Sequence, residues 1–387
     1  MQLSNRIQAV APSATMAMTQ AARSMREAGQ HVISLSVGEP DFATPAHILD
    51  AANQAMQEGH TRYTAADGIT ELKEAICAKF ARDNQLTYLP ENINVSPGGK
   101  AVLWNALSVT VGPRDEVIVP TPCWVSYPDM VKLTGATPIL LAGGADFKIT
   151  PKALEEAITP KTRWLMLNSP SNPTGAVYSA DELSALADVL RKYPQVMILT
   201  DDIYEALVYG DAAFATIATV APDLQDRTLT MNGVSKAYAM TGFRIGYAGG
   251  PKWLIDAMRK FMGQTTSNSC SVSQWASVAA LNGSQDFLDD WRAAYRSRAE
   301  MMVKALNMIG LTCTLPDGAF YIFANCEALM DEKGLESDAE LAMAILKEAR
   351  VATVSGSAFY SPGHLRLSYA ASMEELTQAC ARIAEFC

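Results

Sequence analysis

The chain has 387 residues, of which 49% are hydrophobic and 19% charged, a composition that supports a sizeable core and, at this length, two domains. Its formal net charge of −10 argues against a nucleic-acid-binding protein and against attachment to an anionic membrane surface. The charge does not exclude an anionic small-molecule substrate, because a local cationic pocket can lie within an acidic protein.

Cysteine and histidine usage favours a cytoplasmic protein without a metal centre. The seven cysteines include no CxxC pair, and an odd number scattered over a long chain is typical of reduced thiols. The four histidines are too dispersed to predict a zinc site. Polar residues interrupt the apolar stretch before residue 22, so we expect no signal peptide. No run approaches the roughly 20 apolar residues that a membrane helix needs.

Between about residues 95 and 265, short apolar runs alternate with amphipathic helical stretches. In the stretch 180–192, for example, Leu183, Leu186 and Leu190 fall on one helical face. Apolar strands that alternate with helices predict an α/β domain with a mostly parallel sheet covered on both faces. The expected strands are Val117–Val119, Pro138–Leu141, Trp164–Leu167, Val196–Leu199, Thr228–Met231 and Ile245–Ala248.

The pattern changes after about residue 283, which predicts a smaller α+β domain. A long helix over residues 286–308 and a last helix over 373–386 enclose three strand-like segments. The first 45 residues show no place in the central sheet and are expected to pack with this second domain. We therefore expect a large domain over residues 46–283 and a small domain built from residues 1–45 and 284–387. The three strand-like segments are Ala319–Ala324, Val351–Val354 and His364–Tyr369.

Polar residues follow the apolar runs at the places where parallel sheets bind ligands, outside the carboxyl ends of the strands. Lys236 lies among small and apolar residues after one such run. A lysine there can lose its proton and attack an aldehyde to form a Schiff base, although a lone lysine is more often a solvated loop residue. Ser235, Arg244 and the backbone at Gly233 accompany it, and together these groups suit a phosphate dianion.

A second run ends in Asp201, and Tyr204 follows three residues later. A carboxylate that faces a pyridine nitrogen keeps this nitrogen protonated and strengthens the ring as an electron sink. The phenol of Tyr204 could donate a hydrogen bond to an oxygen of the ring. An ordinary helix N-cap explains Asp201 equally well.

Two further segments suggest rigid contacts to a ligand. Two X-Pro steps within Asn168–Gly175 predict an extended, rigid turn that would fix the amide of Asn172, and a plain turn is the alternative. Gly98 and Gly99 open a helical stretch and let backbone N–H groups approach an anion. The spacing differs from that of a nucleotide P-loop, and the chain has no GxGxxG, which weighs against a dinucleotide enzyme.

From about Pro12 to the end of the chain, these segments resemble the class I/II aminotransferases of the fold type I pyridoxal-phosphate enzymes. The resemblance is closest to the bacterial aspartate aminotransferase branch, which includes members that accept prephenate. It implies an α/β fold with a large domain around a mostly parallel seven-stranded sheet and a smaller α+β domain. The most specific matches are Asn172–Gly175, Asp201-x-x-Tyr204, and Ser235–Lys236 with Arg244. Further matches are Val37–Phe42, Pro122–Tyr127, Gly318–Tyr321 and Leu365–Tyr369.

The resemblance implies a pyridoxal 5′-phosphate cofactor. Lys236 would form the Schiff base with it and then shuttle a proton between substrate and cofactor. Asp201 would pair with the pyridinium, while Tyr204 and Asn172 would bind the ring oxygen. The other implied cofactor contacts are Trp124 stacked on the ring, Gly98, Gly99, Lys100, Ser235 and Arg244 at the phosphate, and Tyr63 at the phosphate of the neighbouring subunit.

The implied reaction is amino-group transfer between an L-amino acid, foremost aspartate, and 2-oxoglutarate in a homodimer with shared active sites. Arg366 would bind the α-carboxylate in a bidentate fork, and Lys100 would meet the distal carboxylate. Two positions depart from the family: Asp202 stands where glutamate is usual, and Ala11 stands where some relatives are basic. The implied substrate contacts are Thr15, Gly38, Lys100, Trp124, Asn172 and Arg366.

Three alternatives stay open at this point. One is an aminotransferase of another preference, for prephenate, arginine, methionine or aromatic amino acids. Another is a β-lyase on the same fold, which eliminates rather than transaminates. A non-catalytic cofactor-binding regulator is the third, and the acidic chain without a DNA-binding extension argues against it.

Overall fold

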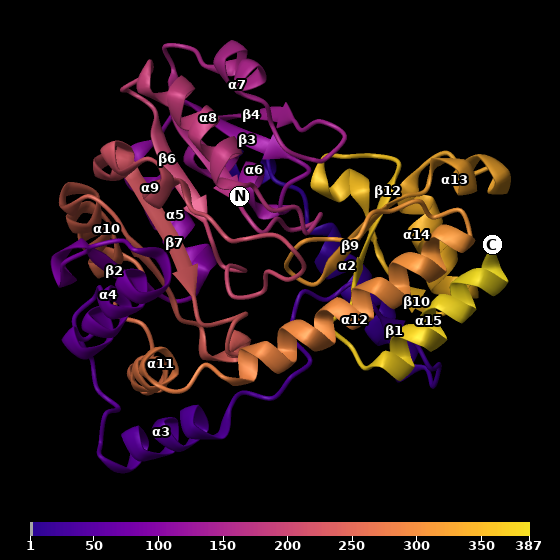
Figure 1. Cartoon of the computed structure of the whole chain (residues 1–387), viewed down its shortest axis with the longest axis horizontal. Helices are drawn as coiled ribbons and strands as arrows, with labels where there is room; N and C mark the ends of the chain where they lie inside the picture. Colours follow the sequence, from indigo (N-terminus) through magenta and orange to yellow (C-terminus); the bar gives the residue numbers. More distant parts are fainter. Residues whose placement is uncertain (1–2) are drawn as a thin grey trace.

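The computed structural model describes residues 3–387. Residues 1 and 2, which the expected small domain includes, lie outside the described part. The chain forms a larger body around one wide sheet and a smaller body near the C-terminus, and the long helix α12 (Phe287–Met308) runs from the first toward the second (Figure 1).

The wide sheet has seven strands, and their order in space differs from their order in the sequence. Four neighbouring pairs are parallel, whereas β8 runs antiparallel to both of its neighbours. This confirms the expected mostly parallel sheet. In spatial order the strands are β2 (Ile93–Ser96), β8 (Gly246–Gly249), β7 (Thr228–Gly233), β6 (Met197–Asp201), β5 (Thr162–Asn168), β3 (Glu116–Thr121) and β4 (Thr137–Ala142).

Helices cover both faces of this sheet because side chains alternate between the faces along each strand. Trp164 and Met166 of β5 are buried on one face, and Leu165 and Leu167 are buried on the other. Each such side chain contributes roughly 1.5–3 kcal/mol when fully buried. The first face packs against α5 (Gly99–Thr110), α6 (Ser126–Thr134) and α10 (Lys252–Gln264). The second packs against α7 (Pro151–Ala157), α8 (Ala180–Arg191) and α9 (Ile217–Val220).

The start of α8 illustrates how the sequence fixes a boundary. Ser179 accepts a hydrogen bond from the backbone N–H of Glu182 at 3.2 Å, and the Glu182 carboxylate accepts one from the N–H of Ser179 at 2.8 Å. This capping box satisfies two of the N–H groups that a helix start leaves without a partner. The helix therefore begins at residue 180, as the periodicity predicts.

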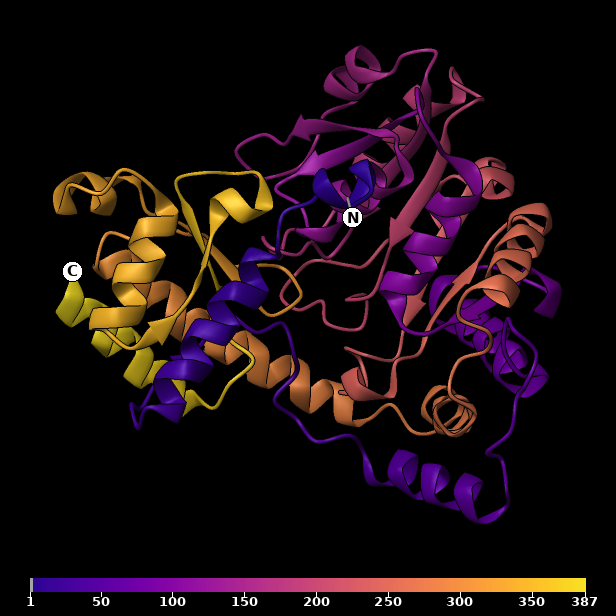
Figure 2. The ribbon, with the colours of Figure 1, turned by 180° about the vertical axis from the view of Figure 1, so that it is seen from behind.

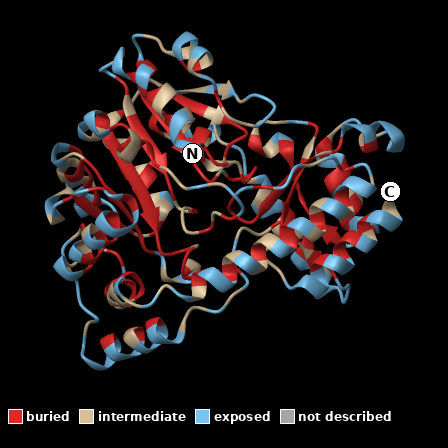
Figure 3. Ribbon diagram, in the orientation of Figure 1, coloured by how far each residue is buried: buried red, intermediate tan, exposed pale blue. Residues whose placement is uncertain are grey.

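A third group of helices covers the β2–β8 side of the sheet. These are α3 (Ala46–Gln57), α4 (Thr70–Asn84) and α11 (Ser271–Asn282). Figure 3 shows the central strands buried, whereas the edge strand β4 is partly exposed and the surrounding helices are exposed on their outer sides. Short 3-10 turns occur at Pro90–Asn92, Pro222–Arg227, Thr241–Phe243 and Gly356–Phe359.

The smaller body combines both ends of the chain. Strand β1 (Ile33–Ser34) pairs in parallel with β10 (Val351–Ala352), and α2 (Ala14–Glu27) lies beside the C-terminal elements (Figure 2). A three-stranded antiparallel sheet has the order β11 (Val354–Ser355), β12 (His364–Ser368), β9 (Tyr321–Asn325). The remaining helices of this body are α13 (Glu327–Lys333), α14 (Asp338–Glu348) and α15 (Met373–Phe386), whereas α1 (Asn5–Gln8) lies against α6 of the larger body. The domain boundaries expected near residues 45 and 283 stay a prediction.

Two features differ from the expected elements. Strand β2 was not expected, because its four residues are interrupted by the polar Asn94, which is buried and hydrogen-bonded to Ser96 at 2.7 Å. The expected strand 351–354 is split between two sheets, since β10 pairs with β1 whereas β11 pairs with β12. A single apolar run cannot reveal that its halves pair with different partners.

The structure of residues 3–387 also bears on two other kinds of function. Within this part of the chain, no helix combines the length and hydrophobicity needed to traverse a lipid bilayer. Likewise, these residues contain no group of three or more histidine, cysteine or acidic side chains arranged to hold a metal ion.

A buried ion pair ties α4 to the segment that follows β6. The ammonium of Lys79, whose exposed fraction is 3%, pairs with the carboxylate of Glu205 and donates a hydrogen bond to Oδ1 of Asn84 at 2.6 Å. The Asn84 amide in turn donates to Glu205 at 2.8 Å. Breaking a buried pair leaves an uncompensated charge, and this costs more than the pair itself contributes.

We expect Lys79→Met to lower the free energy of unfolding by about 3 kcal/mol, because the Glu205 carboxylate then lacks its counter-ion. Urea unfolding of the apoprotein measures this change. Arg23→Met is the matched control: its ion pair with Glu27 is 71% and 61% exposed, so the change should stay below about 0.5 kcal/mol. Equal losses in the two variants would contradict the prediction.

Candidate active site

One cavity of about 410 Å³ brings most of the predicted residues together. It opens where β3, β5, β6 and β7 end, next to the point between β3 and β5 where the strand order reverses. The segment after β1 and strand β12 close its other side. Twelve of the fourteen predicted residues line it: Thr15, Gly38, Gly99, Lys100, Trp124, Asn172, Asp201, Tyr204, Ser235, Lys236, Arg244 and Arg366.

Lys236 lies three residues after the end of β7, with its side chain in the cavity. Its Nζ donates a hydrogen bond to the backbone carbonyl of Gly38 at 2.5 Å. Desolvation by the surrounding protein lowers the pKa of Lys236 to about 8, and the negative charge of Glu39 partly opposes this shift. A substantial fraction of the amine is therefore neutral, and nucleophilic, in mildly alkaline solution.

Asp201 is the last residue of β6 and is buried. One carboxylate oxygen accepts a hydrogen bond from the Tyr127 hydroxyl at 2.7 Å, and the other accepts one from the N–H of Ile203 at 3.2 Å. Burial raises the pKa of Asp201 to about 6, while these hydrogen bonds and the charge of Lys236 oppose the rise. The carboxylate is thus ionised at neutral pH and points into the cavity beside Lys236.

Asp202, the position that departs from the family, is buried away from the cavity. It accepts a hydrogen bond from the Thr200 hydroxyl at 2.5 Å. Burial raises the pKa of Asp202 to about 8, so this carboxyl group is mainly neutral at pH 7 and adds little negative charge beside Asp201. The departure from the family at residue 202 therefore lies outside the cavity lining.

An anion cradle lies at the start of α5. Gly98 has a φ of +88°, and a side chain there would overlap with the guanidinium of Arg244, so glycine is required at this point. The N–H groups at the start of the helix face the same region as the Ser235 hydroxyl. Arg244 donates to the carbonyl of Thr241 at 2.8 Å. Free helix N–H groups, a hydroxyl and a guanidinium together form a site for an anion such as phosphate.

Arg366 reaches the cavity from β12 and is 2% exposed. Its guanidinium donates to Oδ1 of Asn172 at 3.0 Å and to the carbonyl of Ser36 at 2.7 Å. Within the described chain its Nε has no hydrogen-bond partner, and no carboxylate forms an ion pair with it. A buried cation without a counter-ion at the edge of a cavity is suited to a carboxylate ligand.

Lys100 and Trp124 form another wall of the cavity. The Nζ of Lys100 lies 4.7 Å from the centre of a Trp124 ring. Desolvation and the positive charge of Arg244 lower the pKa of Lys100. Four cationic side chains thus share the cavity lining with only two carboxylates, Glu39 and Asp201, so the cavity carries a positive charge within an acidic protein.

Two predicted residues do not line the cavity. Gly98 lies directly beneath Arg244, one residue outside the lining. Tyr63 is 91% exposed and does not line the cavity, so its predicted contact depends on a second subunit. Seven further polar residues line the cavity without having been predicted, although four of them, Glu39, Ser126, Tyr127 and Tyr321, stand within motifs that carry the resemblance. The additional polar lining residues are Ser13, Glu39, Ser126, Tyr127, Asn168, Thr241 and Tyr321.

Comparison with known proteins identifies the family. Residues 30–383 match the family described as aminotransferase class I and II. An aspartate/prephenate aminotransferase of Cereibacter sphaeroides is 51% identical, over 100% of this chain and 98% of its own. An aspartate aminotransferase of Rhizobium meliloti is 48% identical over 99% and 95% of the two chains.

Solved structures agree with the sequence comparison. The aspartate aminotransferase from Rhizobium meliloti has a TM-score of 0.95 and 46% identity, with 100% of this chain and 98% of that chain covered. The aspartate aminotransferase from Thermus thermophilus with maleate has a TM-score of 0.95 and 40% identity, with both chains covered completely. The expected family and fold are confirmed, and the chain belongs to the aminotransferase class I and II family as an enzyme of the transaminase type.

Proposed function

We propose that this chain binds pyridoxal 5′-phosphate on Lys236 and transfers an amino group between aspartate and 2-oxoglutarate. The observation that carries the proposal is that a lysine of lowered pKa and a buried arginine without a counter-ion line the same cavity. The first is the reactive group and the second is the anchor for an amino acid.

The residues present fit this cofactor. The phosphate suits the cradle of α5 N–H groups, Ser235 and Arg244, where a side chain at Gly98 would fill the space of the Arg244 guanidinium. The ionised carboxylate of Asp201 suits a protonated pyridine nitrogen, and the indole of Trp124 offers a flat face for the ring. Tyr204 and Asn172 supply hydrogen-bonding groups for the ring oxygen.

When bound, pyridoxal 5′-phosphate supplies an electron sink for the substrate's Cα–H bond. Lys236 is the catalytic residue: its neutral Nζ removes the proton from the substrate Cα atom and returns a proton later in the reaction. Asp201 keeps its negative charge at neutral pH because its pKa is about 6. Tyr204 stays a neutral phenol, since burial raises its pKa well above its ordinary value, and it can therefore donate a hydrogen bond.

The charge of the cavity supports a dicarboxylic substrate. Arg366 presents a planar guanidinium to the α-carboxylate, aided by Asn172 and the Gly38 backbone. Lys100 is a second cation in the same cavity and is assigned to the distal carboxylate, with Thr15 nearby in the lining. Relatives named aspartate or aspartate/prephenate aminotransferase support this choice.

The working enzyme is proposed to be a homodimer in which Tyr63 contacts the phosphate bound to the neighbouring subunit. Its side chain is 91% exposed and does not line the chain's own cavity, which supports this role. A large domain over residues 46–283 and a small domain over 1–45 and 284–387 belong to the same proposal. All seven cysteines are free thiols, which supports a cytoplasmic location.

We expect the chain reconstituted with pyridoxal 5′-phosphate to absorb visible light, and aspartate alone to change this absorbance and yield stoichiometric oxaloacetate. Lys236→Ala should abolish turnover, and borohydride should trap the cofactor on residue 236 of the unaltered chain only, as peptide mass spectrometry would reveal. Absence of a half-reaction with all common amino acids would exclude transamination. Pyruvate and ammonia from cysteine-type substrates would instead indicate a β-lyase.

The lowered pKa of Lys236 also predicts a pH-dependent stability of the apoprotein. The unfolded chain binds more protons than the folded one between pH 8 and pH 10.5, so the folded state gains stability as the pH rises through this range. Below pH 8 the cost of the buried ammonium is fully present. Lys236→Met should therefore be more stable at pH 7, by an amount on the order of 2 kcal/mol.

Urea unfolding across this pH range measures the difference between the Lys236→Met variant and the unaltered chain. The extra stability of the Lys236→Met variant should decrease as the pH rises from 8 to 10.5. Lys152→Met serves as the control, because that side chain is 84% exposed and its removal should give no such pH dependence. If the extra stability of Lys236→Met did not change with pH, the ammonium form of Lys236 would carry no energetic cost in the folded state. That result would contradict the prediction.

Substrate preference is tested by comparing Lys100→Met with Arg366→Lys. We expect Lys100→Met to lower kcat/KM for aspartate about 10–100-fold and that for alanine less than about threefold, since only aspartate loses a charged hydrogen bond. Arg366→Lys should weaken both donors alike, because an ammonium cannot reproduce the two-point fork. Equal losses for both donors in Lys100→Met would remove the distal-carboxylate role and favour another donor class.

A further inference from the structure

We infer that Tyr321 is a positioning residue that orients both Tyr204 and Arg366, its hydroxyl acting on the first and its ring on the second. This inference rests on the function proposed above and adds a residue to it. Tyr321 lies in the Gly318–Tyr321 motif, for which the sequence predicts no role, and the structure makes it part of the cavity lining.

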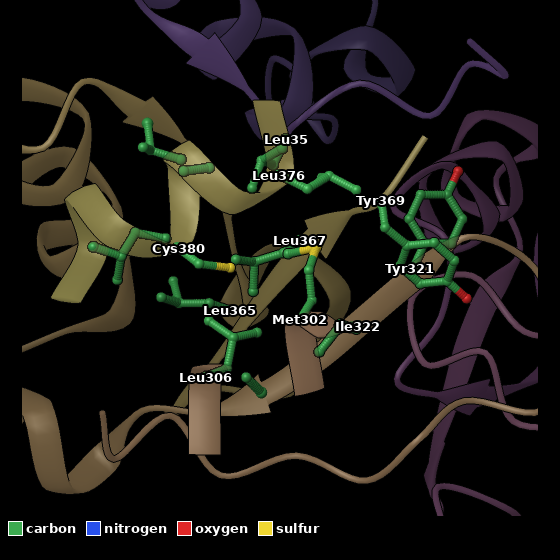
Figure 4. Packing of buried hydrophobic residues seen from close by; sticks show 14 of the residues in the cluster. Leu35, Met302, Leu306, Tyr321, Ile322, Leu365, Leu367, Tyr369, Leu376 and Cys380 are labelled. Carbon is green, nitrogen blue, oxygen red and sulfur yellow. The ribbon is translucent and has the colours of Figure 1, made fainter. Parts of the chain in front are cut away.

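Strand pairing brings Tyr321 to Arg366. In the antiparallel pair β9–β12, Phe323 is opposite Arg366 and Tyr321 is opposite Ser368, so Tyr321 is the diagonal neighbour of Arg366 on the same face. The ring of Tyr321 is buried at the border of the apolar cluster of the smaller body. Figure 4 shows its hydroxyl directed away from the aliphatic side chains of that cluster.

The hydroxyl of Tyr321 contacts the group assigned to the cofactor oxygen. It lies 2.8 Å from the Tyr204 hydroxyl, and both phenols are buried. Burial raises the pKa values of both groups, so each keeps its proton and one can donate to the other. The rings of Tyr204 and Tyr321 pack edge to face, with ring centres 5.8 Å apart. Tyr204 thus has one polar partner that fixes where its oxygen lies.

The same hydroxyl limits the approach of the segment after β1. A Cβ atom at Gly38 would overlap with the Tyr321 oxygen, so only glycine lets this segment come so close. The carbonyl of Gly38 is also the acceptor for Nζ of Lys236. Tyr321 therefore borders the position of Lys236 through the backbone of Gly38.

The ring of Tyr321 holds the guanidinium of Arg366. The Arg366 carbon Cζ lies 4.6 Å from the centre of the Tyr321 ring and 4.8 Å from that of Phe359. The guanidinium is thus held between two aromatic rings, a contact that attracts the cation and restricts its plane. This contact requires the ring but not the hydroxyl, so the two roles of Tyr321 are separable by mutation.

Two variants separate these roles. Tyr321→Phe keeps the ring and removes the hydroxyl, so KM for aspartate should change less than about threefold. The pH midpoint of the visible absorbance of the protein with pyridoxal 5′-phosphate bound should rise, because a less well-oriented Tyr204 stabilises the deprotonated chromophore less. Tyr321→Leu removes the ring as well as the hydroxyl. The absorbance midpoint should rise as in Tyr321→Phe, and KM should also rise about tenfold for aspartate and alanine alike.

Tyr178→Phe is the matched control. Its buried phenol accepts a hydrogen bond from the N–H of Ile149 at 2.9 Å, outside the cavity, so its loss should leave the absorbance midpoint and KM unchanged. Affinity for pyridoxal 5′-phosphate, measured by fluorescence titration of the apoprotein, should fall in Tyr321→Phe and not in Tyr178→Phe. Thermal melting of each apoprotein verifies that the variants fold.

The outcomes distinguish this inference from the proposed function. An unaltered chain that binds no pyridoxal 5′-phosphate overturns the proposed function. An unaltered chain that binds it and transaminates, with Tyr321→Phe identical in midpoint and affinity, overturns the role of the hydroxyl. A Tyr321→Leu variant with unchanged KM for both donors overturns the role of the ring. If Tyr321→Leu does not fold, the Tyr321→Phe measurements still decide the first role.

Discussion

Three cationic side chains of the cavity donate hydrogen bonds to backbone carbonyls rather than to carboxylates, and the positive charge of the site depends on this arrangement. Lys236 donates to the carbonyl of Gly38, Arg244 to that of Thr241, and Arg366 to that of Ser36. Arg366 is buried and Lys236 is largely desolvated, whereas Arg244 is exposed. For the first two, a charge with no partner would cost several kcal/mol, and the carbonyl dipole offsets part of that cost. Because a carbonyl does not neutralise the cation, each positive charge is left to attract an anionic ligand.

The sheet explains how these cations come within reach of one ligand. Parallel strands end at the same edge, so the end of β6 and the segments after β5 and β7 bring Asp201, Asn172 and Lys236 into one cavity although they are far apart in sequence. The anion cradle joins them because β2 runs parallel to β7 through the antiparallel strand β8 between them. The groups proposed to bind the phosphate and the ring thus lie along one edge of the sheet, and Arg366, the proposed carboxylate anchor, joins them from β12.

Much of this arrangement could be predicted from the sequence. The apolar runs predicted all five strands of the parallel part and β8 beside them, six of the seven strands of the sheet. The polar residues singled out after these runs line the cavity. The relation of Tyr321 to Arg366 could not be predicted, because it depends on the register of an antiparallel pair whose strands are 40 or so residues apart. The contact of Tyr127 could not be predicted for a similar reason, because its hydroxyl binds Asp201, a residue of another element that is distant in the sequence.

Strand β2 escaped prediction because buried Asn94 breaks its apolar pattern, and the split of 351–354 depends on which sheet each half joins. The predicted contact of Tyr63 is of another kind. Its side chain points into solvent in the single chain, so no sequence pattern and no fold of one subunit can test it. Local periodicity therefore predicts the elements, whereas pairing between distant segments decides which side chains meet.

The segment after β1 connects the two bodies at the reactive centre. Ser36 and Gly38, two residues apart, offer their carbonyls to Arg366 of the smaller body and to Lys236 of the larger one. Asp41 of the same segment accepts two hydrogen bonds from Arg298 of α12, at 2.8 and 2.9 Å, which fixes the segment to the helix that runs between the bodies. One short stretch of backbone thus sets the distance between the proposed carboxylate anchor and the proposed reactive amine. A change in its path would move the two groups relative to each other, and catalysis that depends on orientation is sensitive to shifts of about 1 Å.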